Sequence, residues 1–187
     1  MIESKIWMAT SSDDKYKEAK EVLAEFGVEL GRIDVEKIEV QADDPVEIVE
    51  YSLRQMEDDG RVVVMEDAGI FIEHFGGFPG PYSSYVLERL GNPGILKLME
   101  GVENRRAHYG SAVAIRRGSE IKSFRGYVRG TISESIRGTG GFGYDPIFIP
   151  DEGDGRTFGE MTEEEKNVIS HRARAFRKLG EWLASSP

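Results

Sequence analysis

The chain has 187 residues, a formal net charge of −10, 31% charged and 39% hydrophobic residues, which is a globular balance rather than a disordered one. The absence of cysteine excludes disulfides, thiolate metal sites and a cysteine nucleophile, and it is consistent with a reducing compartment. The acidic balance argues against a nucleic-acid binder, and neither a long apolar run nor a signal-peptide pattern is visible, so we expect no membrane association.

The start of the chain predicts a strand followed by a helix. Residues 5–9 form a short apolar run that stops at Thr10-Ser11-Ser12-Asp13-Asp14, where a hydroxyl or carboxylate can cap a helix. Apolar residues then recur at helical spacing until Gly27, which is expected to end the helix. A second extended segment is expected at residues 35–40.

Residues 44–67 predict a second helix and a buried strand. Asp44-Pro45-Val46-Glu47 is a favourable helix start, because proline fits the first turn and the glutamate can reach back to the cap. Residues 61–65 hold a continuous β-branched run, typical of a strand that is buried on both faces. Glu66 and Asp67 follow directly, and we expect them at the C-terminal end of this strand, where open α/β sheets place their ligands.

The second half of the chain predicts two short helices, a hairpin and a final helix. The helices are expected at residues 82–90 and 93–99, the β-hairpin at 107–127, and a short strand at 147–149, while Ser170 can cap the last helix. Together these elements predict a mixed α/β fold with a central β-sheet flanked by helices and an antiparallel extension. We expect a single domain over residues 1–187, with two lobes around a cleft.

Two acidic residues are candidate metal ligands. Asp67 follows the buried strand, and Glu39 lies in the second extended segment. Carboxylates at neighbouring strand ends could share one Mg²⁺, which takes few protein oxygens and prefers phosphates and waters as its other ligands. The alternative is that Glu66-Asp67 only makes the junction between strand and turn polar, and spacing leaves both readings open.

Three basic residues are candidates for binding an anion. Lys15 lies at the start of the first helix, whose free N–H groups would also face an anion. Lys166 follows three glutamates, and Arg172 follows His171. The alternative for each is a solvated surface charge.

Residues 138–143 match the string G-x-G-x-x-G but do not predict a dinucleotide site. They follow no buried strand, and Tyr144-Asp145-Pro146 cannot open the required helix. We expect a loop that presents Phe142 for stacking on a base and Asp145 beside it, the alternative being that Phe142 fills the core. No histidine-rich metal spacing, G-x-S-x-G elbow or phosphate-binding P-loop is present.

Taken in order, these motifs resemble those of the inosine/xanthosine triphosphate pyrophosphatases, which remove non-standard purine nucleotides. The resemblance spans nearly the whole chain, and its most specific pieces are F-G-Y-D-P at residues 142–146 and S-H-R at 170–172. The other matching strings are Ala9-Thr10-Ser11-Ser12-Asp13-Asp14-Lys15, Glu39-Val40-Gln41, Glu66-Asp67-Ala68-Gly69-Ile70, Gly77-Phe78-Pro79-Gly80 and Thr157-Phe158-Gly159-Glu160-Met161.

The resemblance implies a cytoplasmic homodimer that hydrolyses ITP, dITP or XTP to the monophosphate and pyrophosphate, with Mg²⁺ or alternatively Mn²⁺. Glu39 and Asp67 would hold the metal, and Asp67 and Lys15 would be the catalytic residues. Phe142 would stack on the base, while Asp145, His171 and Arg172 would read its edge. Carried over position by position, the substrate would contact Thr10, Ser11, Ser12, Asp13, Asp14, Lys15, Ala68, Phe142, Gly143, Tyr144, Asp145, Lys166, His171 and Arg172.

Three positions depart from the family pattern. Ser11-Ser12 stands where Gly-Asn is usual, Glu66 replaces a common Asp, and Ala68 replaces a common Ser. A Ser hydroxyl or a backbone N–H could replace the lost amide contact, and any contact at Ala68 must come from the backbone. Two alternatives therefore stay open, a related pyrophosphatase for modified pyrimidine nucleotides and a nucleotide-binding regulator without turnover.

Overall fold

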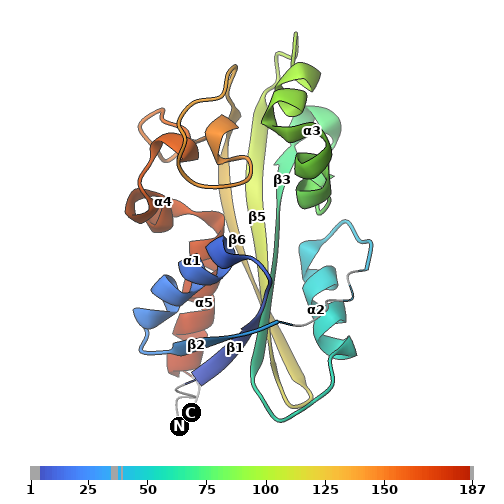
Figure 1. Ribbon diagram of the computed structural model, residues 1–187, viewed down its shortest axis with the longest axis vertical. Coiled ribbons are helices and arrows are strands. Elements are labelled where there is room, and N and C mark those ends of the chain that lie inside the picture. Colours follow the sequence, from blue (N-terminus) through green and yellow to red (C-terminus); the bar gives the residue numbers. More distant parts are fainter. Residues whose placement is uncertain (1–4, 35–37, 39, 186–187) are drawn as a thin grey trace. The chain divides into compact units, whose positions relative to one another are not determined.

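The computed structural model describes residues 5–34, 38 and 40–185 (Figure 1). Within these residues a seven-stranded mixed sheet has the strand order β2-β1-β3-β5-β6-β7, with β4 paired to β3. The strands are β1 (Lys5–Ala9), β2 (Glu29–Ile33), β3 (Val63–Ile72), β4 (Pro79–Gly80), β5 (Arg106–Arg117), β6 (Glu120–Ile132) and β7 (Phe148–Pro150). The helices are α1 (Asp13–Ala24), α2 (Pro45–Gln55), α3 (Ser83–Leu98), α4 (Glu163–Ile169) and α5 (His171–Ser185), with the 3-10 turns η1 (Glu73–Phe75), η2 (Asp145–Ile147) and η3 (Phe158–Glu160).

The predicted mixed α/β fold is confirmed, and the chain divides into two compact units. The first unit comprises Met1–Asp67, Ser111–Gly126 and His171–Pro187, and the second comprises Ala68–Gly110 and Tyr127–Ser170. Strands β3, β5 and β6 each contribute residues to both units, because each of them passes a unit boundary. The cleft expected between two lobes stays a prediction.

The first unit has helices on both faces of its strands. Helices α1 and α5 lie side by side on one face, and α2 covers the other (Figure 1). Along β3 the side chains alternate between two buried clusters, with Val64 facing α1 and α5 while Val63 and Met65 face α2. The β-branched run is therefore buried on both faces, as its sequence predicts.

The second unit encloses one aromatic-rich core. Tyr109 of β5 packs edge-on against Phe148 of β7 with ring centroids 4.8 Å apart, and Phe148 contacts Phe158 of η3 at 5.3 Å. Residues of α3, such as Ile95, and the buried Ile70 of β3 complete the cluster. This core carries the loop that holds the candidate site residues Phe142 and Asp145.

Local capping explains where α1 and α2 begin. The Ser12 side chain accepts a hydrogen bond from the Lys15 amide, and the Asp44 side chain accepts one from the Val46 amide. Pro45 occupies the first turn of α2, where a missing N–H is harmless. Both predicted helix starts are confirmed, and α5 buries an apolar face.

One strand was not predicted, and one strand prediction needs correction. The second strand is β2, at Glu29–Ile33, and it pairs in parallel with β1, whereas residues 35–37 and 39 of the expected segment lie outside the described residues. Strand β3 extends to Ile72, so Glu66 and Asp67 lie in its middle rather than at its end. The parallel partner β1 ends at Ala9, so both acids lie beyond the last residue of that neighbouring strand.

The remaining elements agree with the sequence. Helix α3 contains both expected short helices, which are interrupted at Gly91 by backbone angles outside the helical region. Strands β5 and β6 form the hairpin, with a two-residue turn at Gly118-Ser119 in which Gly118 has a φ of 58°. Across the described part of the chain, no helix combines the length and the apolar character that a membrane crossing needs.

Candidate active site

The first unit contains a buried cluster of charges around Glu66 of β3. Its Oε2 lies 2.9 Å from the ammonium of Lys15, and its Oε1 lies 3.0 Å from Nε of Arg172. Ser111 of β5 donates a hydrogen bond to Oε1 at 2.8 Å, and Arg172 also donates to Glu18 of α1 at 2.8 Å. The cluster therefore joins α1, β3, β5 and the start of α5.

The charges of this cluster stabilise one another. Burial alone would raise the pKa of Glu66, but Arg172 and Lys15 outweigh it and hold the pKa well below its ordinary value. Burial opposes the charge of Arg172 in the same way, yet Glu66 and Glu18 raise its pKa. Lys15 is the more accessible cation, with 24% of its side chain exposed against 3% for Arg172. Lys15 is therefore the cation of this cluster that a ligand could reach.

A tight turn between β1 and α1 precedes Lys15. The Thr10 hydroxyl accepts a hydrogen bond from the Ser12 amide at 3.1 Å, and the Ser12 hydroxyl accepts one from the Lys15 amide at 3.3 Å. The proton of the Ser12 hydroxyl remains available for donation. The turn thus presents hydroxyl and amide donors at the positive end of α1, which is the arrangement that favours an anion.

The other candidate residues of the first unit differ in how exposed they are. Asp13 and Asp14 are exposed in the first turn of α1, and Asp13 pairs with Arg32, so a phosphate would meet their amides rather than their carboxylates. Asp67 and Ala68 are half-buried neighbours in β3, and Ser11 is exposed. Glu39 lies outside the described residues.

The second unit contains a separate cluster around Asp145. Its Oδ2 accepts hydrogen bonds from the Lys166 ammonium at 2.7 Å and from the Phe142 amide at 2.8 Å. Tyr109 donates to its Oδ1 at 3.4 Å. The ammonium of Lys166 also lies 4.4 Å from the centroid of the half-buried Phe142 ring. An aromatic face and a buried cation are therefore held beside one another.

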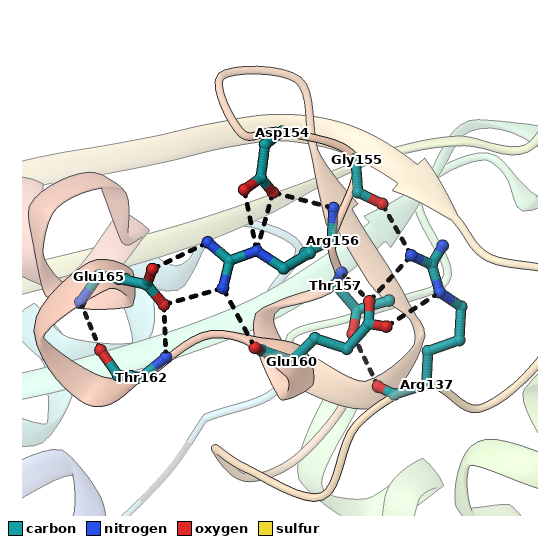
Figure 2. Close-up of polar contacts among 8 residues, drawn as sticks. All are labelled: Arg137, Asp154, Gly155, Arg156, Thr157, Glu160, Thr162 and Glu165. Atoms are coloured by element: carbon teal, nitrogen blue, oxygen red, sulfur yellow. Dashed lines mark hydrogen bonds and ion pairs between the residues drawn. The ribbon is translucent and has the colours of Figure 1, made fainter.

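Figure 2 shows how the segment that leads to Lys166 is fixed. The guanidinium of Arg156 donates to both carboxylate oxygens of Glu165, at 2.9 and 3.0 Å, and to Asp154. Glu165 in turn forms a capping box with Thr162, in which each backbone amide donates to the other side chain. The hydrogen bonds from Arg156 and from the Thr162 amide hold the pKa of Glu165 at about 2. The N-terminus of α4, which carries Lys166, is thereby anchored.

The candidate residues lie in both units. Lys166 contacts Asp145 in the second unit, and Arg172 contacts Glu66 in the first. Lys166, Arg172 and His171 are all buried, so the alternative of a solvated surface charge is wrong for the two cations. Residues 138–143 lead into the 3-10 turn η2 and not into an α-helix, which confirms that they form no dinucleotide fingerprint.

Several residues of the two clusters were not predicted. The role of Glu66 was missed, as were those of Glu18, Ser111 and Tyr109. Glu18 carried a signal, because it is an acid on the buried face of α1 that also holds Ala19 and Val22. Ser111 and Tyr109 lie in β5, where nothing in the strand pattern distinguishes a polar cluster from a core position.

The carboxylates of the described residues limit the kind of metal site that the chain can form. Among the described residues, no group of three or more His, Asp or Glu side chains forms a metal cage. A Mg²⁺ site needs only one or two carboxylates when phosphates and waters supply the other ligands. The half-buried Asp67 provides one such hard oxygen donor, so the residues present fit a shared magnesium–phosphate site.

Comparisons with known proteins cover almost the whole chain. The model of the Ham1 family matches residues 6–182. A dITP/XTP pyrophosphatase from Methanopyrus kandleri is 48% identical over 184 residues, and one from Pyrobaculum aerophilum is 48% identical over 182 residues, each match covering 97% of both chains.

Solved structures of similar proteins share the fold. A HAM1 protein from Coxiella burnetii superposes with a TM-score of 0.85 at 27% identity, covering 97% of this chain and 99% of that chain. A dITP/XTP pyrophosphatase from Mycobacterium abscessus superposes with a TM-score of 0.73 at 31% identity, covering 94% of this chain and 98% of that chain.

Proposed function

The chain belongs to the Ham1 family, and we propose that it hydrolyses non-standard purine nucleoside triphosphates, such as dITP, ITP and XTP, to the monophosphate and pyrophosphate. One observation carries this proposal: the match of 48% identity over 97% of both chains to proteins named dITP/XTP pyrophosphatase. The cluster around Glu66 supplies chemistry that suits a phosphate group, and the cluster around Asp145 supplies chemistry that suits a purine base. We extend the proposal to a cytoplasmic homodimer, as the family resemblance implies.

The triphosphate is assigned to residues of the first unit. The amides at the start of α1 and the hydroxyls of Thr10 and Ser12 are donors for phosphate oxygens. The ammonium of Lys15 adds a positive charge that Glu66 holds in place at 2.9 Å. In this position the Lys15 ammonium can stabilise the charge that develops on the leaving pyrophosphate.

The hydrolytic step is assigned to Asp67. Its carboxylate orients a water molecule and accepts a proton from it, while the water oxygen bonds to the α-phosphorus. The bond from that phosphorus to the bridging oxygen breaks, and pyrophosphate leaves with the electron pair. When bound, Mg²⁺ or Mn²⁺ supplies positive charge to the phosphate oxygens and acidifies water, and Asp67 and Glu39 are its proposed ligands.

The base is assigned to residues of the second unit. Phe142 offers an aromatic face for stacking, and Lys166 offers a donor for the O6 acceptor of hypoxanthine or xanthine. Asp145, whose Oδ2 accepts from Phe142 and Lys166, offers a carboxylate acceptor of the kind that the N1–H donor of these bases requires. Adenine reverses both edge groups, and unpaired buried polar groups can discriminate between such substrates by about 10⁴-fold.

A substrate panel tests this function. The protein is incubated with dITP, XTP, dGTP, dATP and a modified pyrimidine triphosphate, and released pyrophosphate is measured with Mg²⁺ and then with excess EDTA. We expect fast release from dITP and XTP, slow release from dATP, and no release in EDTA. Equal rates with all purine triphosphates would remove the base-edge argument, and binding of dITP without turnover would favour a regulator.

A further inference from the structure

We propose that Asn92 is a positioning residue that fixes the loop carrying Phe142 and thereby sets selectivity for the purine base. This inference rests on the proposed function. It concerns residues of the second unit only: the break in α3, the loop at residues 141–145 and Lys166.

The break in α3 delivers Asn92 to the loop. Gly91 has φ 62° and ψ −178°, which no helix tolerates, and Pro93 lacks the amide that a continuous helix would need. The sequence Gly91-Asn92-Pro93-Gly94 thus concentrates residues with poor helix propensity in the middle of a helical segment. Such a break lowers stability unless a contact made there offsets the loss.

The contact made at the break is a hydrogen bond to the loop. Nδ2 of Asn92 donates to the carbonyl oxygen of Gly143 at 3.0 Å. Its Oδ1 is buried and accepts no hydrogen bond from the described residues. An asparagine before Pro93 would ordinarily cap the next helical turn through this oxygen. Asn92 instead uses its amide on the loop and leaves its own acceptor unsatisfied, so the loop contact is the function of this side chain.

The loop has a weak point where Asn92 holds it. Phe142 is tied on one side by its amide, which donates to Asp145 at 2.8 Å, and Tyr144 is tied by its hydroxyl, which donates to the Ser83 carbonyl at 2.6 Å. Between them lies Gly143, with a φ of 67°; because glycine lacks a Cβ, the adjoining peptide has more freedom to rotate than at other residues. The hydrogen bond from Asn92 restrains the carbonyl of Gly143.

Loosening this peptide would affect recognition of the base. The Phe142 ring is held 4.4 Å from the Lys166 ammonium, so the stacking face and the proposed O6 donor have a fixed relation. A purine with the correct edge gains from both contacts at once, whereas a purine with the wrong edge gains only from stacking. Loss of the Asn92 contact therefore weakens binding of dITP more than binding of dATP.

The test uses Asn92→Ala and the isosteric Asn92→Asp, which keeps the shape but removes the donor. Asn104→Ala is the matched control, because the amide of Asn104 donates to Glu73 at 3.3 Å on the exposed surface of the same unit. Hydrogen–deuterium exchange of residues 138–146 is measured in the free proteins, and KM and kcat are measured for dITP and dATP.

We expect faster hydrogen–deuterium exchange of residues 138–146 in both Asn92 variants and an unchanged exchange rate in Asn104→Ala. For dITP, KM should rise roughly 2- to 12-fold, as the loss of one neutral hydrogen bond allows, with kcat changed less and the dITP-to-dATP preference reduced. Unchanged exchange in residues 138–146 would overturn the proposal even if the protein proves inactive on dITP. Faster exchange with an unchanged KM and preference would also overturn it, since Asn92 would then be only structural.

Discussion

Replacing Glu66 by glutamine should destabilise the fold strongly, although the two side chains have the same shape. The Glu66 carboxylate is fully buried and contacts Lys15 and Arg172 at 2.9 and 3.0 Å. Glutamine can still accept the hydrogen bond from Ser111, but it carries no charge. The cluster changes from two cations and two anions to two cations and Glu18 alone: Arg172 keeps Glu18, and the partly buried Lys15 ammonium loses its partner.

The size of this effect follows from the burial of the cluster. Removing one partner of a buried ion pair typically costs about 3–5 kcal/mol, because the charge that remains is desolvated and uncompensated. For a domain of this length each kcal/mol shifts Tm by roughly 2–4 °C, so we expect Tm to fall by roughly 6–20 °C. Adding Lys15→Met to Glu66→Gln should restore part of the loss, because charge balance within the cluster returns.

Thermal and guanidinium unfolding of four proteins measure this prediction: wild type, Glu66→Gln, the double variant and Glu100→Gln. Glu100 is the control, because it pairs with Lys97 at 2.8 Å on an exposed surface and should leave Tm unchanged. An unfolding free energy of Glu66→Gln within about 1 kcal/mol of wild type would refute the reasoning, since a buried charge would then need no partner.

Three further predictions follow from the same contacts. In the folded protein the pKa of Glu66 lies below its ordinary value of 4.5, so the ionised carboxylate stabilises the fold at pH values above 4.5. The free energy of unfolding, measured by chemical denaturation, should therefore fall as the pH drops below 4.5. It should fall less steeply in Glu66→Gln. Asp67→Asn should abolish pyrophosphate release while circular dichroism and Tm show an intact fold, and turnover near that of wild type would exclude Asp67 as the base. Arg156→Met should lower Tm and raise KM for dITP, because it releases α4. The differences in Tm and KM from wild type should be smaller in 1 M salt, which screens exposed ion pairs. Differences that persist at high salt would show that the ion pairs to Asp154 and Glu165 are not their cause.

The elements that could be predicted well are those whose determinants lie within a few neighbouring residues of the chain. Ser12 and Asp44 cap α1 and α2 through hydrogen bonds that span at most three residues, so a short string contains all the information. The buried run at Val63, Val64 and Met65 likewise needs only its own composition to indicate burial on both faces.

The elements that sequence predicted poorly depend on distant partners. Strand β3 continues past Asp67 because Ile70 and Phe71 pair with β4, a two-residue strand that carries no strand signal of its own. Strand β2 was not predicted: it pairs with β1 from Lys5 onward, and Gly31 fits against Trp7 where a larger side chain would clash.

The candidate site shows the same limit. Motifs placed Lys15, Asp145, Lys166 and Arg172 among the candidates, but Lys166 lies 21 residues from Asp145 in the chain and Arg172 lies 106 residues from Glu66. Nothing in a single sequence says that Arg172 contacts Glu66, or that Lys166 contacts Asp145. Residue types could therefore be predicted, whereas the two clusters could not.

Hydrolysis of dITP in water enriched in ¹⁸O tests the proposed chemistry most directly, with the products analysed by mass spectrometry. Attack on the α-phosphorus predicts deoxyinosine monophosphate that carries one ¹⁸O, together with unlabelled pyrophosphate. Release of orthophosphate, or ¹⁸O found in the pyrophosphate, would contradict the assignment of this chain as a nucleoside-triphosphate pyrophosphatase that cleaves at the α-phosphorus.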